Sequence, residues 1–265
     1  MNTIDEILRG LVAESVPDNE VAVLLSGGVD SNSLAFAAHQ LGKKVTGYTF
    51  HLEGQPTYDS AKAADVCNTM GWNCVTVAVP IENLHNDFLI LHRKFNCIKK
   101  THYECTFPFL YVYPLIREKY ILSGIAADGH YGVSKKACMH YKEPKSLFDR
   151  FRYEYFKQTN PAGFLQQAYL ADAYDRIFVA PYLHKTVIKY FNQYDWFELN
   201  QPYQKHHVRE AFQEFKLIKG IKNHINLQLG AGVDKLFESV IIQDPTINFK
   251  NRKRVMDICR DWAKH

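Results

Sequence analysis

Several features that would assign a chain to a broad class are missing from this 265-residue sequence. Its six cysteines form no C-x-x-C pair, which argues against a zinc ribbon and against the paired cysteines of many sulfur-transferring enzymes. No stretch approaches the ~20 apolar residues of a membrane span, and the N-terminal residues lack the pattern of a secretory leader. We therefore expect reduced, mostly buried thiols in a cytoplasmic protein with no membrane partner.

An excess of charge of one sign is also missing. The formal net charge is +4 and the pI is about 8.6, which is too mild to predict nucleic-acid binding. One basic segment, residues 248–265, is compatible with a helix that lies on nucleic acid. A charged surface helix with Val255, Ile258 and Trp262 packed inward is the simpler interpretation.

The most informative segment that is present is VAVLLSGGVDS, residues 21–31. Its apolar run predicts a strand buried on both faces, and a helical pattern begins near Asp30 and runs to Leu41. Between them, Gly27 and Gly28 carry no Cβ atoms, so backbone N–H groups and the helix N-terminus can approach an anion. The Gly-Lys-Ser/Thr of a Walker loop is absent, so this anion site is of another kind.

Strand and helix patterns alternate along the first half of the chain. Strands are predicted at residues 44–52, 73–79 and 120–123, and helices at residues 3–15 and 58–70. A capping box is expected at the start of the first helix and a terminating glycine after the second. This alternation predicts an α/β fold with a doubly wound, mostly parallel sheet.

From about residue 140 onward the pattern becomes helical and aromatic. Phe148, Phe151, Tyr155 and Phe156 recur at helical spacings. We expect a single domain over residues 1–265, with an α/β core at about residues 17–140 and appended C-terminal helices at about residues 141–265.

The SGGVDS motif at residues 26–31 resembles the SGGxDS signature of the PP-loop ATP pyrophosphatases, which bind ATP and cleave it to AMP and pyrophosphate. Further segments resemble, in the same order, blocks of the C-terminal synthetase domain of asparagine synthetases. They are residues 48–79, 120–132 (YILSGIAADGHYG), 170–191, 203–215 (YQKHHVREAFQEF) and 227–238. The resemblance implies an adenine nucleotide alpha hydrolase-like fold, a core that binds ATP and a helical region on the acceptor side.

The resemblance also implies where ATP binds. Ser26 and Ser31 would donate hydroxyl hydrogen bonds to phosphates, beside the N–H groups of the loop and the helix N-terminus. The segment from Phe50 to Leu52 would line the adenine site. The expected nucleotide-binding residues are Leu25, Ser26, Gly27, Gly28, Asp30, Ser31, Phe50, Leu52, Ser123 and Gly124.

Mg²⁺ is the metal that this chemistry implies, because a hard cation prefers carboxylate and phosphate oxygens. Asp30 belongs to the loop motif, and Asp128 aligns with the aspartate of the family's GADE motif. Both follow predicted neighbouring strands, so both are candidate metal ligands and catalytic residues. A turn residue before Gly129 is the alternative interpretation of Asp128.

Lys205 is a third candidate catalytic residue. It lies four positions from Arg209 on an expected helix face, where the pair could contact ATP phosphates or an acidic substrate. A solvated basic face is the more frequent outcome for such a pair. The histidines show no tight metal-ligand spacing, and only His130, close to Asp128, is a candidate to border the site.

The acceptor half of the pattern departs from the family. Ile125 stands where the family has a glutamate near the acceptor and the attacking ammonia. Asn226 falls where a lysine is usual, with Lys219 or Lys222 as possible substitutes. Whether asparagine synthesis survives these changes is left open, and so is the identity of the acceptor.

Only about 20 residues precede the first predicted strand, too few for the glutaminase domain of glutamine-dependent asparagine synthetases. We therefore expect the amine to be ammonia, a substrate amine or ammonia delivered by a separate protein. The expected reaction is ATP-dependent adenylation of a small-molecule carboxylate, or a similar oxygen, followed by amine attack. Two alternatives are a PP-loop enzyme that modifies a nucleobase or nucleic acid, and a non-catalytic ATP or AMP binder.

Overall fold

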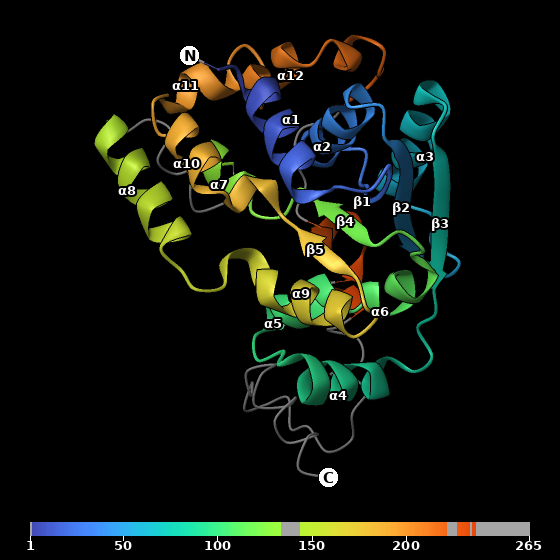
Figure 1. Cartoon of the computed structure of the whole chain (residues 1–265). Coiled ribbons are helices and arrows are strands. Elements are labelled where there is room, and N and C mark those ends of the chain that lie inside the picture. The colour runs from blue at the N-terminus through green and yellow to red at the C-terminus, as the bar shows by residue number, and fades with distance from the viewer. Residues whose placement is uncertain (1, 134–143, 222–226, 234, 237–265) are drawn as a thin grey trace.

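A computed structural model of the chain shows a central β-sheet with helices packed on both faces (Figure 1). It describes residues 2–133, 144–221, 227–233, 235 and 236. All strands of its five-stranded sheet are parallel, in the order β3-β2-β1-β4-β5. Their bounds are β1 (Glu20–Leu24), β2 (Lys44–Leu52), β3 (Asn73–Val79), β4 (Tyr120–Ser123) and β5 (Ile177–Val179).

Each face of the sheet carries its own hydrophobic core, because successive side chains of a strand leave on opposite faces. In β1, Val21 and Val23 enter one core, while Ala22 and Leu24 enter the other. The first core is covered by α1 (Ile4–Ser15), α2 (Val29–Gln40), α3 (Tyr58–Met70), α10 (Lys185–Phe191) and α12 (His206–Ala211). The second is covered by α4 (Leu84–Phe95), α5 (Lys100–Thr106), α6 (Phe109–Val112) and α9 (Phe164–Asp172).

The doubly wound α/β class is confirmed, and so are the elements expected in the first half. The observed bounds of β2, β3, β4 and α3 are those predicted. The Thr3 N–H donates to Glu6 Oε2 at 2.9 Å, which completes the expected capping box of α1. Gly71 ends α3 with a φ of 69°, a left-handed conformation that glycine adopts without strain.

The region after residue 140 is helical with one exception. The aromatic pattern forms α8 (Lys145–Phe156), as expected. Strand β5 was not predicted, since its three residues are too few to show a period of two. It pairs with β4, so the sheet extends beyond the expected core at residues 17–140. The other elements are α7 (Asp128–Tyr131), α11 (Trp196–Asn200), α13 (Leu227–Gly230), and the 3₁₀ turns η1 (Tyr113–Leu115), η3 (Pro161–Gly163), η4 (Pro181–Leu183) and η5 (Gln213–Lys216).

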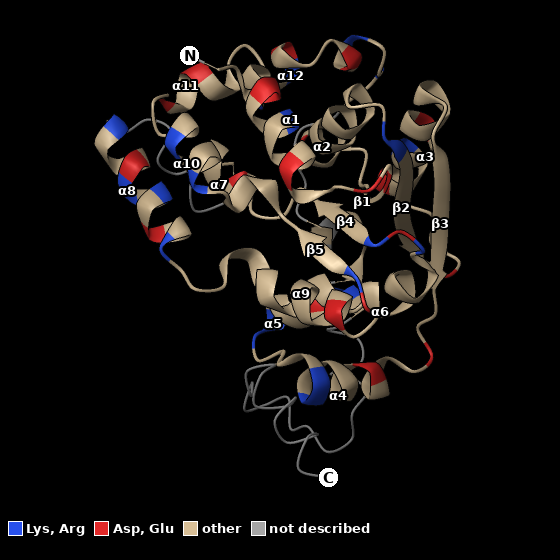
Figure 2. Cartoon of the chain, in the orientation of Figure 1, with Lys and Arg blue, Asp and Glu red and all other residues tan. Residues whose placement is uncertain are grey.

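Charged residues of both signs are mixed on the surface helices (Figure 2). On α8, for example, Lys145, Asp149, Arg150 and Glu154 alternate in sign. Among the described residues, no helix is both long and apolar enough to cross a bilayer. The basic segment 248–265 lies outside the described residues.

The strand order creates a crevice at one edge of the sheet. From β1 the chain winds outward through β2 to β3, then returns to place β4 on the other side of β1. Neighbouring loops therefore leave the carboxyl ends of β1 and β4 in opposite directions. Open parallel sheets bind ligands at such a reversal of strand order.

Candidate active site

The crevice opens into a cavity of about 600 Å³. It lies at the carboxyl ends of β1, β2 and β4, where the expected nucleotide-binding residues gather. Those that line it are Leu25, Ser26, Gly27, Gly28, Asp30, Ser31, Phe50, Ser123 and Gly124. Leu52 does not line it, because this side chain is fully buried in the second core with Ala231 and Val233.

The loop between β1 and α2 is shaped by close backbone contacts. Gly27 has a φ of 70°, and a Cβ atom there would lie 2.7 Å from Cγ of Lys62. Ser31 Oγ accepts a hydrogen bond from the Ser26 N–H at 3.2 Å, and Ser26 Oγ accepts one from the Gly28 N–H at 3.3 Å. Because the first N–H groups of α2 have no partner within the helix, this end of the cavity suits a phosphate chain.

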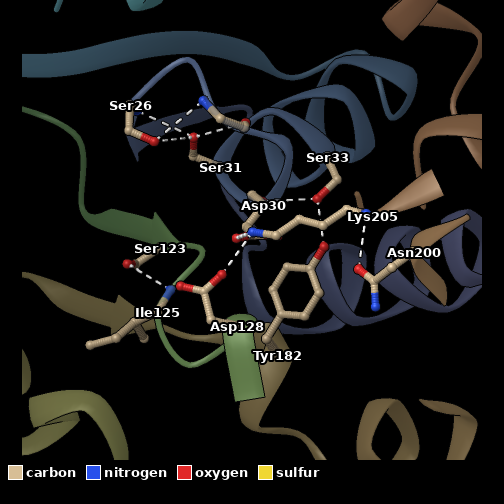
Figure 3. A network of polar contacts seen from close by, with 11 residues as sticks. Ser26, Asp30, Ser31, Ser33, Ser123, Ile125, Asp128, Tyr182, Asn200 and Lys205 are labelled. Carbon is tan, nitrogen blue, oxygen red and sulfur yellow. Dashed lines mark hydrogen bonds and ion pairs between the residues drawn. The ribbon is translucent and has the colours of Figure 1, made fainter. Parts of the chain in front are cut away.

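A lysine from a distant segment meets two aspartates at this loop (Figure 3). Lys205 Nζ donates to Asp30 Oδ2 at 2.5 Å and to Asp128 Oδ1 at 2.7 Å, and the lysine side chain is only 5% exposed. Burial alone would lower the pKa of Lys205, but the charges of Asp128 and Asp30 outweigh it and raise the pKa to about 12. Lys205 is therefore a cation at neutral pH, and the expectation of a solvated basic face is wrong for it.

The backbone at Lys205 is held in an unusual conformation. The residue is the N-cap of α12 and has a φ of 59°, which few non-glycine residues adopt. The Lys205 N–H donates to Asn200 Oδ1 at 3.2 Å, and Asn200 Nδ2 donates to the Tyr131 carbonyl at 3.0 Å. A buried amide thus fixes the backbone from which Lys205 reaches the aspartates. Arg209 instead stacks on Tyr203 and does not line the cavity.

Asp128 starts α7, a few residues after the end of β4. The chain turns there, and the Ile125 N–H donates to Ser123 Oγ at 3.3 Å. Gly124 packs directly on the first turn of α2, since a Cβ atom at this position would lie 2.9 Å from Cβ of Asp30. This contact between the β4–α7 loop and α2 brings Asp30 and Asp128 to the same lysine.

The two aspartates fit a magnesium ion that is shared with a nucleotide. Both oxygens lie within 2.7 Å of one nitrogen, so they are separated by about 5 Å at most and can face one cation. Mg²⁺ in nucleotide sites commonly takes one or two carboxylates and completes its shell with phosphates and water. A cluster of three or more His, Cys, Asp or Glu ligands is absent from the described residues, so the protein alone would not complete that shell.

The rest of the cavity has a different lining, which we call the acceptor wall. It consists of Lys99, His102 and Cys105 at α5, and of Phe151 and Tyr155 on α8. His130, the histidine expected to border the site, does not line the cavity. Burial lowers the pKa of His130 to about 3.

A family model for asparagine synthase matches residues 3–210, a segment that contains the whole sheet and all three charged residues of the site. The chain belongs to the asparagine synthase family. This family comprises ATP-dependent adenylating enzymes of the PP-loop type. A search of curated proteins found no significant match to the chain.

In this member of the asparagine synthase family, Ile125, at the position where the resemblance implies a glutamate, lines the cavity. Asn226 and Lys222 lie outside the described residues, whereas Lys219 is exposed and accepts a hydrogen bond from Lys62 through its carbonyl. Within the part of the chain that the structure describes, Lys205, from the segment 203–215, supplies the ammonium group that contacts both aspartates.

Several supporting residues escaped sequence analysis. Asn200 positions Lys205, and Tyr182 hydrogen-bonds with Ser33 Oγ at 2.7 Å, behind Asp30 (Figure 3). Asn32 Nδ2 donates to the Gly27 carbonyl at 3.1 Å and braces the loop. Of these three residues, only Asn32 directly follows the SGGVDS motif. Its place in the sequence was the one feature that could have predicted a supporting role.

Proposed function

We propose that the protein is an AMP-forming ligase that makes a carbon–nitrogen bond. A carboxylate oxygen of the acceptor attacks the α-phosphorus of ATP, and the bond from that phosphorus to the β-bridging oxygen breaks. Pyrophosphate leaves, and an acyl adenylate remains. Ammonia or an amine then attacks the acyl carbon, AMP departs with the bonding electrons, and the nitrogen loses a proton.

The convergence of Asp30, Asp128 and Lys205 on one point of the cavity carries this proposal. Cleavage next to the α-phosphorus builds negative charge on pyrophosphate, which a fixed cation stabilises. Lys205 stays charged because its pKa is about 12. Mg²⁺, held by the two aspartates and the phosphates, would supply further positive charge.

The remaining residues of the loop would bind and orient ATP. Ser26, Ser31 and the N–H groups at the start of α2 would hold phosphates, while Phe50 and the end of β2 would lie beside adenine. Confining both reactants in one cavity converts a bimolecular step into an effectively unimolecular one. It also limits contact of the acyl adenylate with water.

The amine source is a separate part of the proposal. Ile125 can neither accept a proton nor pair with an ammonium, so the proton lost by the amine must pass to another acceptor. Free ammonia, an amine of the substrate, or ammonia delivered by a separate protein are compatible with such a site. A cytoplasmic location and a small-molecule acceptor complete the proposal.

Transfer of oxygen from acid to AMP tests the reaction directly. The protein is incubated with ATP, Mg²⁺, ammonium and carboxylates labelled with ¹⁸O, and the AMP is analysed by mass spectrometry. One ¹⁸O atom in AMP, absent with Asp30→Asn, is the expected result. ADP in place of AMP, or unlabelled AMP, would contradict acyl adenylation. Binding of ATP without any turnover would favour the non-catalytic alternative, and label transfer only from a nucleobase oxygen would favour the nucleobase alternative.

A further inference from the structure

The ring of Tyr155 lies directly beside the reacting centre. An added Cβ atom at Gly129 would lie 2.3 Å from two carbons of this ring and 3.0 Å from Cζ, the carbon that carries the hydroxyl group. Because Gly129 directly follows Asp128, α8 places a phenol group next to one of the two aspartates. Phe156 and Phe151 lie 5.0 Å and 6.1 Å from the ring of Tyr155, measured between ring centroids. Packing therefore fixes the ring without help from its hydroxyl group.

The hydroxyl group of Tyr155 has no partner, and its oxygen is accessible. It makes no hydrogen bond with any residue that the structure describes, and its oxygen does not belong to the buried, unpaired polar atoms of this part of the chain. The residue lines the cavity, and so do Asp128 and Asp30, whose charges act on this hydroxyl group. The hydroxyl group is therefore open to a ligand in the cavity, close to the point where Lys205 meets the aspartates.

Tyr155 can act as a hydrogen-bond donor but not as a base. Burial raises the pKa of Tyr155, and the charge of Asp128 raises it further, so the phenol keeps its proton at neutral pH. A neutral donor that packing holds in place stabilises negative charge that develops on a substrate oxygen. In the proposed ligase, such charge develops on the acyl oxygen when the amine attacks. Ile125, on the same loop as Asp128, has no side-chain donor to offer there.

We propose that Tyr155 is a catalytic residue of the amine-transfer step, in which its hydroxyl group donates a hydrogen bond to the acyl oxygen of the adenylate. This inference rests on the proposed ligase function. The amine nitrogen forms a bond to the acyl carbon, and the electron pair of the carbonyl π bond moves to the acyl oxygen. That pair then re-forms the carbonyl bond, AMP departs with the bonding electrons, and the nitrogen gives its proton to water. Tyr155 keeps its own proton throughout.

Separate assays of the two half-reactions test the inference. Exchange of labelled pyrophosphate into ATP, measured without an amine, reports formation of the acyl adenylate. Incorporation of ¹⁵N from ammonium, measured in a single turnover, reports amide formation. The acids tried are aspartate, glutamate, benzoate and 3-phenylpropanoate, and the acid that gives the fastest exchange is used for the variants. The hydrogen bond of Tyr155 should matter in the second assay, because charge develops on the acyl oxygen only there.

Tyr155→Phe removes the hydroxyl group and keeps the ring on Gly129. We expect the rate of amide formation to fall about 10²-fold, with the rate of pyrophosphate exchange and the Kd for ATP little changed. Tyr153→Phe is the matched control, because Tyr153 lies on the same helix, is 64% exposed and does not line the cavity. Both of its rates should equal those of the unaltered protein. Equal melting temperatures establish that the variants are folded.

The outcomes separate the inference from the function beneath it. An unchanged rate of amide formation in Tyr155→Phe overturns the inference and leaves the ligase proposal standing. An equal loss of exchange and of amide formation also overturns it, because the hydroxyl group would then act before the amine attacks. If the unaltered protein binds ATP but gives neither exchange nor AMP with any of these acids, the ligase proposal and the inference fail together.

Discussion

The two halves of the cavity are built in different ways. On the side expected to bind ATP, the glycine loop and Asp30 come from one short segment that follows a buried strand, whereas Asp128 and Lys205 come from distant segments. The acceptor wall is assembled from α5 and α8, which are almost 40 positions apart in the chain. The phosphate loop of the first half offers mainly backbone groups, whereas the second half is lined by side chains, so substitutions alter the second half more easily.

Under the proposed function, that difference would let a member of the asparagine synthase family keep one half and change the other. Phosphate binding by a glycine loop and a helix N-terminus needs few side chains beyond small ones. Under the proposed function, acceptor binding would depend on positions such as Ile125, where one substitution changes charge or hydrogen bonding. Experiments that affect one half without the other are therefore the sharpest tests of the comparison.

Removing the shared cation should have the largest effect on the ATP side. Lys205→Met removes the buried ammonium group that Asp30 and Asp128 share, so we expect the free energy of unfolding to fall by about 3–5 kcal/mol. The melting temperature should fall by roughly 10 °C, by the usual scaling for a domain of this size. Because Mg²⁺ can then occupy the position of the ammonium group, added MgCl₂ should stabilise this variant more than the unaltered protein in thermal melts.

The control is Lys145→Met on α8, which removes an exposed partner of Asp149 and should cost less than about 1 kcal/mol. An equal Mg²⁺ effect in Lys205→Met and the unaltered protein would show that the ammonium group and the metal do not compete for the aspartates.

Neutralising Asp128 should have the second-largest effect, which is a loss of turnover. Asp128→Asn keeps the shape of the side chain but removes its charge, and we expect kcat for pyrophosphate release to fall about 10²–10³-fold. Steady-state rates at saturating ATP measure this loss. Asp172→Asn, on the exposed end of α9, should leave the rate unchanged. A similar kcat for Asp128→Asn and the unaltered protein would remove Asp128 from the reacting centre.

Sequence patterns predicted the first strand, its glycine loop and the helix that follows because these parts are contiguous. A buried strand, two glycines and a helix start stand next to one another in residues 21–31, and each has a local physical signature. The position of Lys205 has no such signature, since it depends on a left-handed backbone held by Asn200. The burial of the Leu52 side chain was not predicted, because strand periodicity does not reveal which residue another segment covers. The acceptor wall was beyond prediction, because it depends on contacts such as that of Tyr155 with Gly129.

Two glycine substitutions should separate the halves with smaller effects. In Gly124→Ala, the methyl group would meet the backbone and Cβ of Asp30, so we expect KM for ATP to rise about 10-fold while KM for the acid is unchanged. In Gly129→Ala, it would displace the Tyr155 ring, so KM for the acid should rise by a similar factor while KM for ATP is unchanged. Steady-state kinetics with each substrate varied in turn measure both.

Gly10→Ala provides the control for this pair, because nothing lies within 4 Å of an added Cβ atom on this turn of α1. It should leave both KM values as they are. If Gly124→Ala and Gly129→Ala raise the two KM values in the same proportion, the cavity behaves as one unit and the comparison fails.

The smallest expected effect concerns His130, which is fully buried and does not line either half of the cavity. Its ring stacks between Phe156 and Phe191, and Nε2–H donates to the Tyr182 carbonyl at 2.8 Å. Burial lowers its pKa to about 3, with Arg152 lowering and Asp128 raising it as lesser influences.

The unfolded chain binds a proton at this histidine near pH 6.5, whereas the folded chain does not until about pH 3. Stability from His130 is therefore present above pH 6.5 and is lost as the pH falls, by about 2 kcal/mol between pH 7 and pH 5. His130→Phe removes the titration, so urea unfolding at the two pH values should show a smaller loss for the variant by about that amount. The ATP-side variant Gly124→Ala, which leaves His130 in place, should keep the full loss. If His130→Phe keeps it too, the acid sensitivity arises elsewhere, and the core beneath the two halves does not set it.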